Sequence, residues 1–125
     1  MEKFPQGEQL NYVFELDQGC RVYMAGTRPD PHQIKIAGDL QADITLLQVP
    51  PANALKGLEK ATAELAIASG CQVCVPQHHD PLLKGAKKTE LSTLKKLLAG
   101  IRFQELVPGK WYVFDGKQLN TYDAY

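Results

Sequence analysis

Two short apolar runs, each stopped by proline, constrain the fold of this chain more than any other feature. Ile44–Val49 is almost continuously apolar, which is typical of a strand covered on both faces within a parallel sheet. Leucines and alanines at helical spacing then predict a helix from about Ala52 to Ser69, closed by a glycine. A second run, Val73–Val75, follows that glycine and ends at Pro76. This order predicts a strand-helix-strand unit.

The segment before this unit predicts a β-hairpin. Apolar and polar residues alternate from Leu10 to Leu16, which is the pattern of a half-buried strand. Residues 17–19 (Asp-Gln-Gly) provide a turn, and Cys20–Ala25 is the return strand. The alternation places four apolar side chains on one side of the first strand: Leu10, Tyr12, Phe14 and Leu16.

The remaining chain predicts further elements, which are helices at about Pro31–Leu40 and Glu90–Ala99 and strands at Phe103–Val107 and Trp111–Phe114. Thr89 is the expected N-cap of the helix at Glu90–Ala99. Its apolar side is predicted to contain Leu91, Leu94, Leu97, Leu98 and Ile101. The polar tail, residues 115–125, is predicted to fray. Because no repeat or linker interrupts the chain, we expect one α/β (α+β) domain over residues 1–125.

Composition excludes several classes of protein. The 14 basic side chains balance the 14 acidic ones, so there is no electrostatic footprint for nucleic acid or for an anionic membrane. No run approaches the ~20 apolar residues of a membrane span, and the first residues lack the apolar core of a signal peptide. Three cysteines fit free thiols in a reducing compartment, so we expect a cytoplasmic protein.

The densest group of chemically active residues follows the second apolar run. His78, His79 and Asp80 come directly after it, and loops at the carboxyl ends of such strands are where ligands usually bind. Imidazole and carboxylate are ligands for zinc, and also for manganese or iron. These three residues are therefore the candidate metal ligands, and a solvated loop is the plain alternative.

Two other groups carry weaker hypotheses. Cys71 and Cys74 form a C-x-x-C, but the second cysteine enters a strand instead of opening a helix, so buried inert thiols are the better interpretation. Three lysines follow the histidines and would suit an anionic ligand if the chain were a small α/β binding protein: Lys84, Lys87 and Lys88.

The order of these segments resembles the C-terminal half of the metallo-β-lactamase superfamily, nearest to its ascorbate-6-phosphate lactonase-like branch. The matching pieces span about Leu10 to Phe114 and are Asn11–Leu16, Arg21–Thr27, Ala42–Leu47, Val73–His78 and the turn Val107–Gly109. The resemblance implies half of a four-layer αββα sandwich, with helices on one face of the sheet. It also implies that His78 corresponds to the last metal-binding histidine of the family.

The departures from the family pattern shape the functional expectation. Gly26-Thr27-Arg28 stands where the family has Gly-Asp-Thr, so the bridging carboxylate is absent, and the sequence contains no His-x-His-x-Asp-His motif. The resemblance therefore implies a truncated, non-catalytic half-domain that forms a homodimer, sheet against sheet, or pairs with a separate N-terminal half-domain. The alternative is a metal-dependent hydrolase of lactones or phosphoesters whose site, including His32 and Asp30, is completed across a dimer.

Overall fold

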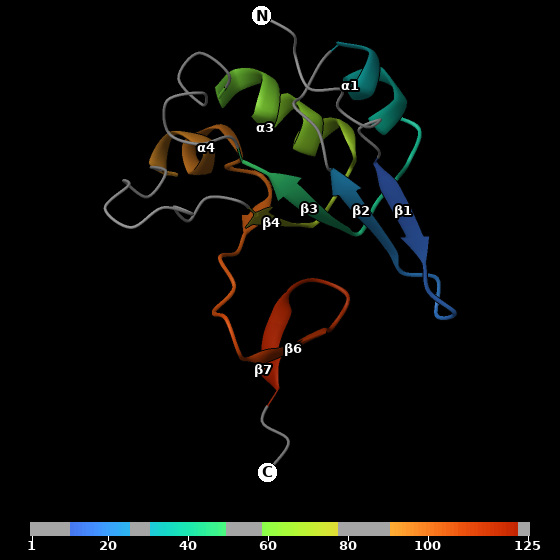
Figure 1. The fold of residues 1–125 in the computed structure, drawn as a ribbon, viewed down its shortest axis with the longest axis vertical. Coiled ribbons are helices and arrows are strands. Elements are labelled where there is room, and N and C mark those ends of the chain that lie inside the picture. The colour runs from blue at the N-terminus through green and yellow to red at the C-terminus, as the bar shows by residue number, and fades with distance from the viewer. Residues whose placement is uncertain (1–10, 26–30, 50–58, 78–90, 123–125) are drawn as a thin grey trace, which may run out of the picture.

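The computed structural model of the chain describes residues 11–25, 31–49, 59–77 and 91–122. The elements within these ranges are, in chain order, β1 (Tyr12–Glu15), β2 (Arg21–Ala25), α1 (Pro31–Ala37), β3 (Ile44–Gln48), α3 (Glu59–Ala68), β4 (Val73–Gln77), α4 (Ser92–Leu97), β5 (Arg102–Phe103), β6 (Trp111–Phe114) and β7 (Leu119–Tyr122). They form a mixed sheet of five strands, a second sheet of two strands and helices on the larger sheet (Figure 1). The predicted α+β class is confirmed.

The five-stranded sheet has the order β1-β2-β3-β4-β5, which is also the order of the chain. β1 pairs with β2 antiparallel through the predicted turn, where Gly19 adopts a φ of 82°. The other neighbours are parallel, so each connection must cross the sheet and carries a helix. The predicted strand-helix-strand unit is β3-α3-β4, and Gly70, with a φ of 75°, ends its helix as expected.

The helices cover one face of this sheet and enclose the main core (Figure 1). Alternate strand residues point into it, among them Tyr23 of β2, Leu47 of β3 and Cys74 of β4. From the helices, Leu65 and Leu94 meet them, and both are almost completely buried. Period-two strands thus supply one wall of the core and amphipathic helices the other.

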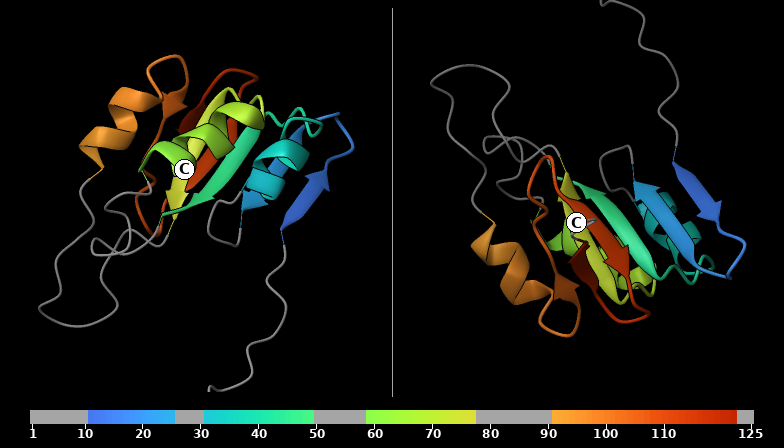
Figure 2. Two further views of the ribbon diagram at one scale, coloured as in Figure 1. Left: turned by 90° about the horizontal axis from the view of Figure 1, so that it is seen from above. Right: turned by 90° about the horizontal axis from the view of Figure 1, so that it is seen from below.

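The opposite face of the sheet is partly covered by the β6–β7 hairpin, which the sequence did not predict. Phe114 and Leu119 pack against a cluster formed by Ile44, Val73 and Val75. Figure 2, seen from below, shows the hairpin in front of β3 and β4 and beside β1 and β2. The prediction of a frayed tail is wrong for Leu119–Tyr122, because β7 pairs with β6 over its whole length.

One side chain fixes the hairpin to the large sheet. The Gln104 amide donates to the Leu119 carbonyl at 2.9 Å and accepts from the Leu119 N–H at 2.8 Å. The Gln104 backbone N–H in turn donates to the Cys74 carbonyl at 2.9 Å, so β4, Gln104 and β7 are linked in series. The hairpin is therefore a third layer of the fold, held by hydrogen bonds as well as by apolar packing.

Several element ends differ from prediction. β4 continues through Pro76, which lies opposite Leu47 of β3. Proline has no N–H to donate, but β5 pairs only with Val73 and Cys74, so no strand on that side needs a hydrogen bond from Pro76. β5 is correspondingly short, at Arg102–Phe103, so the strand predicted at Phe103–Val107 is wrong beyond Phe103. The helix predicted at about Glu90–Ala99 is α4. It begins at Ser92, and its N-cap residue, Leu91, makes no side-chain capping bond. Thr89 lies outside the described residues.

Candidate functional site

The predicted metal ligands follow the carboxyl end of β4 in the sequence. The parallel register aligns this end with that of β3, since Gln77 lies opposite Gln48. His78, His79 and Asp80 themselves lie outside the described residues, as do Thr27, Asp30 and the three lysines. His32 is described, exposed in the first turn of α1. The metal site therefore stays a prediction; within the described ranges, no group of three His, Cys, Asp or Glu side chains could hold an ion.

The C-x-x-C cysteines are both buried in the main core. Cys71 precedes β4 and Cys74 lies inside it, so strict strand alternation does not separate the thiols; both belong to the helix-side cluster. Burial raises the pKa of the Cys74 thiol strongly, and the neighbouring Cys71 raises it further. A thiol that resists ionisation is a poor nucleophile and a poor metal ligand. The interpretation of inert core cysteines is supported for Cys74.

Stability should therefore fall as the pH rises above about 9. The Cys74 thiol stays protonated in the folded chain, whereas the unfolded chain releases this proton near the ordinary cysteine pKa of 9.0. The unfolded state then binds fewer protons, so one such group removes about 1.4 kcal/mol of unfolding free energy between pH 8 and pH 10. Urea unfolding at the two pH values measures this loss. Cys74→Ala should lose correspondingly less; equal losses in both proteins would contradict the assignment.

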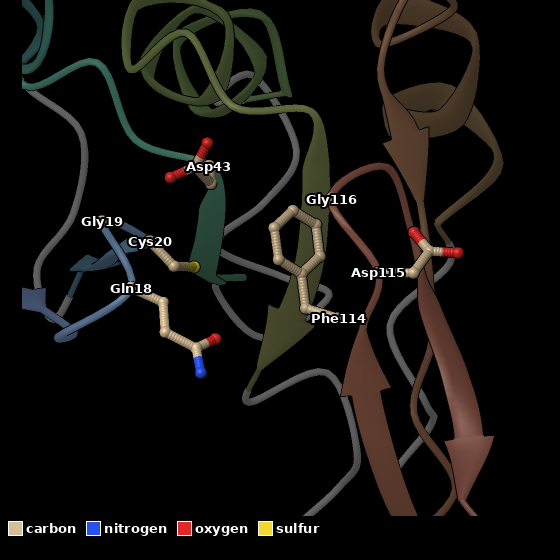
Figure 3. A pocket seen from close by; sticks show the side chains of 7 residues that line it. All are labelled: Gln18, Gly19, Cys20, Asp43, Phe114, Asp115 and Gly116. Carbon is tan, nitrogen blue, oxygen red and sulfur yellow. The ribbon is translucent and has the colours of Figure 1, made fainter.

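An open pocket of about 380 Å³ lies between the β1–β2 turn and the β6–β7 turn (Figure 3). Seven residues line it: Gln18, Gly19, Cys20, Asp43, Phe114, Asp115 and Gly116. Its location is the boundary between the part of the sheet that the hairpin covers and the part that it leaves open.

The acidic groups of this pocket already have structural partners. The Asp43 carboxylate accepts a hydrogen bond from the Arg21 N–H at 2.8 Å, which links the start of β2 to the residue just before β3. Asp115 accepts from the N–H groups of Gln118 and Lys117, which holds the β6–β7 turn and lowers the pKa of its carboxyl. The pKa of the Cys20 thiol is raised by burial and by Asp43. This arrangement supports the turns and offers no activated nucleophile or general base.

The most distinctive surface in the described part of the chain is apolar. Tyr12 and Phe14 of β1 stack with ring centroids 6.2 Å apart, and each is nearly half exposed. Tyr12 lies opposite Met24 and Phe14 opposite Val22, so all four belong to the helix-free face. Leu16, directly after the strand, is 54% exposed. We call this surface, formed by Tyr12, Phe14, Leu16, Val22 and Met24, the β1–β2 face.

Charged side chains of the two strands lie on the other side. Glu15 and Arg21 are direct cross-strand partners, and alternation places both away from Phe14. Their ion pair is 2.6 Å long, and Arg21 also donates to the Leu40 carbonyl at 2.9 Å. The β1–β2 face is therefore uncharged as well as apolar. The register confirms that Tyr12 and Phe14 share one side, whereas Leu10 lies outside the described residues. The prediction of a half-buried strand is wrong, because all four residues of β1 are exposed.

Among the described residues, no helix is long and apolar enough to span a membrane, and the longest, α3, has 10 residues. Comparison with protein families, with curated proteins and with solved structures finds no match to this chain.

Proposed function

We propose that the chain is an assembly half-domain of the metallo-β-lactamase type, non-catalytic alone, whose β1–β2 face packs against a second sheet in a homodimer. A separate N-terminal half-domain is the other cover that would suit this face. The function is thus to present one leaf of a sandwich, with the helices outside and an apolar sheet surface inside. The uncharged, half-exposed β1–β2 face carries the proposal.

Surface chemistry supports this choice over a small-molecule site. The β1–β2 face groups aromatic, leucine, valine and methionine side chains without a charge among them. The cores of protein interfaces are enriched in aromatic residues and methionine and depleted of charge. A contiguous apolar patch of this kind marks an interaction surface more often than a bare monomer surface.

The donor inventory supports the non-catalytic part of the proposal. A binuclear hydrolase needs several fixed histidines and carboxylates to bind its ions and to lower the pKa of bound water. The sequence has three histidines in total, and two of them are adjacent. A metal held by His78, His79 and Asp80 alone would be bound weakly, without the full set of ligands that the family resemblance implies.

We also infer a cytoplasmic location. Cys20, Cys71 and Cys74 are all free thiols, and two of them are buried in the core without forming a bridge. Free buried cysteines are typical of reducing compartments.

Size-exclusion chromatography with light scattering tests the assembly. At about 20 µM we expect the mass of two chains for the wild type. Phe14→Lys should give the mass of one chain, because a buried lysine opposite an apolar surface is unpaired and costly to desolvate. A wild type that remains monomeric at this concentration would refute the homodimer.

Val13→Lys is the matched control. Val13 precedes Phe14 in the same strand, is 40% exposed and lies on the opposite side, across from Tyr23. The same new charge, one residue away, should leave the mass of the assembly unchanged. If both variants dissociate equally, charge and not the β1–β2 face controls the assembly.

A further inference from the structure

We propose that the element covering the β1–β2 face is the β6–β7 hairpin of a second copy, placed through its outer side in a reciprocal, two-fold contact. This inference rests on the proposed homodimer and adds the surface that completes it. In the dimer each hairpin would have two roles. Its inner side covers β3 and β4 of its own chain, and its outer side covers β1 and β2 of the partner.

The outer side of the hairpin is the second exposed apolar surface of the described chain. Trp111 lies directly opposite Tyr122, and Val113 is two residues from Trp111, so the three share one side. Phe114 and Leu119 occupy the other side, which faces the sheet. Trp111 is 76% exposed, Tyr122 54% and Val113 48%. Asn120, opposite Val113, is polar and uncharged, and its amide donates to the Asp115 carboxylate at 2.8 Å next to the β6–β7 turn.

The layer geometry allows the two surfaces to meet. The hairpin occupies the width of two strands and lies over the β3–β4 part of the sheet, leaving the width of β1 and β2 free beside it (Figure 2). Adjacent strands are about 4.8 Å apart and stacked sheets about 10 Å apart, so a second hairpin fits into the same layer. The pocket between the two turns lies at this boundary (Figure 3). The two hairpins would then lie side by side between the two large sheets.

The available area is sufficient for a stable dimer. The six principal side chains are Tyr12, Phe14, Leu16, Trp111, Val113 and Tyr122, each between 46% and 76% exposed. With roughly 100 Å² available from each, as half of a large side chain, one copy buries roughly 600 Å² and the dimer roughly 1,200 Å². That total reaches the lower end of stable, specific interfaces, about 1,200–2,000 Å². Two-fold symmetry covers the β1–β2 face and the outer side of the hairpin in both copies, so neither of these surfaces remains exposed for the chain to polymerise through.

Complementation between two variants tests the pairing. Trp111→Glu and Phe14→Lys should each be monomeric at about 20 µM by light scattering, with the dimer dissociation constant raised at least about 100-fold, because each variant disrupts both contacts of the dimer. An equimolar mixture should return to the mass of two chains. In the mixed dimer, one contact joins two native surfaces. In the other contact, the lysine introduced in one variant faces the glutamate introduced in the other. Each variant on its own instead has a mismatched pair at both contacts.

Controls distinguish this hairpin contact from the proposed homodimer on which it rests. Ile67→Glu, at a 52% exposed position of α3 in the helix layer, should stay dimeric. A second pair, Tyr12→Lys with Tyr122→Glu, repeats the test if either first variant loses its native circular dichroism spectrum. If Trp111→Glu remains dimeric while Phe14→Lys dissociates, or if the mixture fails to associate, the hairpin contact is wrong and the sheet interface survives. A monomeric wild type overturns both.

Discussion

Replacing Leu94 with alanine is expected to lower the unfolding free energy by about 3 kcal/mol. Leu94 lies in α4, is 0% exposed and belongs to the core cluster between the helices and the large sheet. Truncation removes apolar transfer energy and leaves a cavity that the neighbouring side chains fill only in part. For a domain whose whole stability is about 5–15 kcal/mol, this is a large fraction. Urea unfolding followed by circular dichroism measures it.

Leu97→Ala is the matched control for this substitution. The residue type, the helix and the chemical change are the same, but Leu97 is 43% exposed. We expect a loss below about 1 kcal/mol, because much of its apolar surface already contacts water in the folded chain. Similar losses for both leucines would show that α4 does not pack as described.

These two leucines also show how far helical periodicity predicts burial. The sequence placed Leu94 and Leu97 on one apolar side, and the structure buries only the first. α4 has six residues, too few for its own periodicity to determine which side faces the sheet. Its orientation is set by α3 and by the following chain, and neither contact can be deduced from a local pattern.

β1 to β4 of the large sheet were predictable as strands because their information is local. The continuous apolar run of β3 also indicated its burial, whereas β1 alternates and yet is exposed along its whole length. β7 carries no such pattern: its sequence is Leu-Asn-Thr-Tyr, and only Leu119 is even partly buried. Its strand conformation depends on pairing with β6 and on the Gln104 amide, 15 residues away. Long-range pairing of this kind leaves no periodicity in the strand itself.

The same distinction applies to the candidate surface. Alternation in residues 10–16 was enough to predict that Tyr12 and Phe14 share an apolar side. It could not show that the β6–β7 hairpin would pack against Ile44 while leaving Tyr12 and Phe14 exposed, because that depends on a hairpin far along the chain. Among the described residues, the exposed apolar part of this sheet face lies on β1 and β2. A smaller open surface requires a smaller cover, and in the proposed dimer a two-stranded hairpin would supply it.

A second large effect is expected at a buried pair of hydroxyls beneath α3. Thr45 Oγ1 and Ser69 Oγ are 2.7 Å apart, and both residues are 0% exposed. The Ser69 hydroxyl donates its proton to the Ala66 carbonyl at 2.7 Å. Since a hydroxyl has one proton, Thr45 must donate to Ser69. Ser69→Ala removes the acceptor and leaves the Thr45 hydroxyl buried without that bond, so we expect a loss of about 2 kcal/mol.

A double-mutant cycle separates the bond from the packing around it. Thr45→Val alone should lower stability by about 1 kcal/mol, because Ser69 keeps its bond to Ala66 and only the Thr45 donor is lost. Combined with Ser69→Ala, it removes the unpaired hydroxyl, so the double variant should be more stable than the sum of the single effects predicts, by at least about 0.5 kcal/mol. Urea unfolding of all four proteins gives this coupling energy. Strictly additive losses would mean that the hydroxyls do not bond to each other, and that β3 and the end of α3 are joined by apolar packing alone.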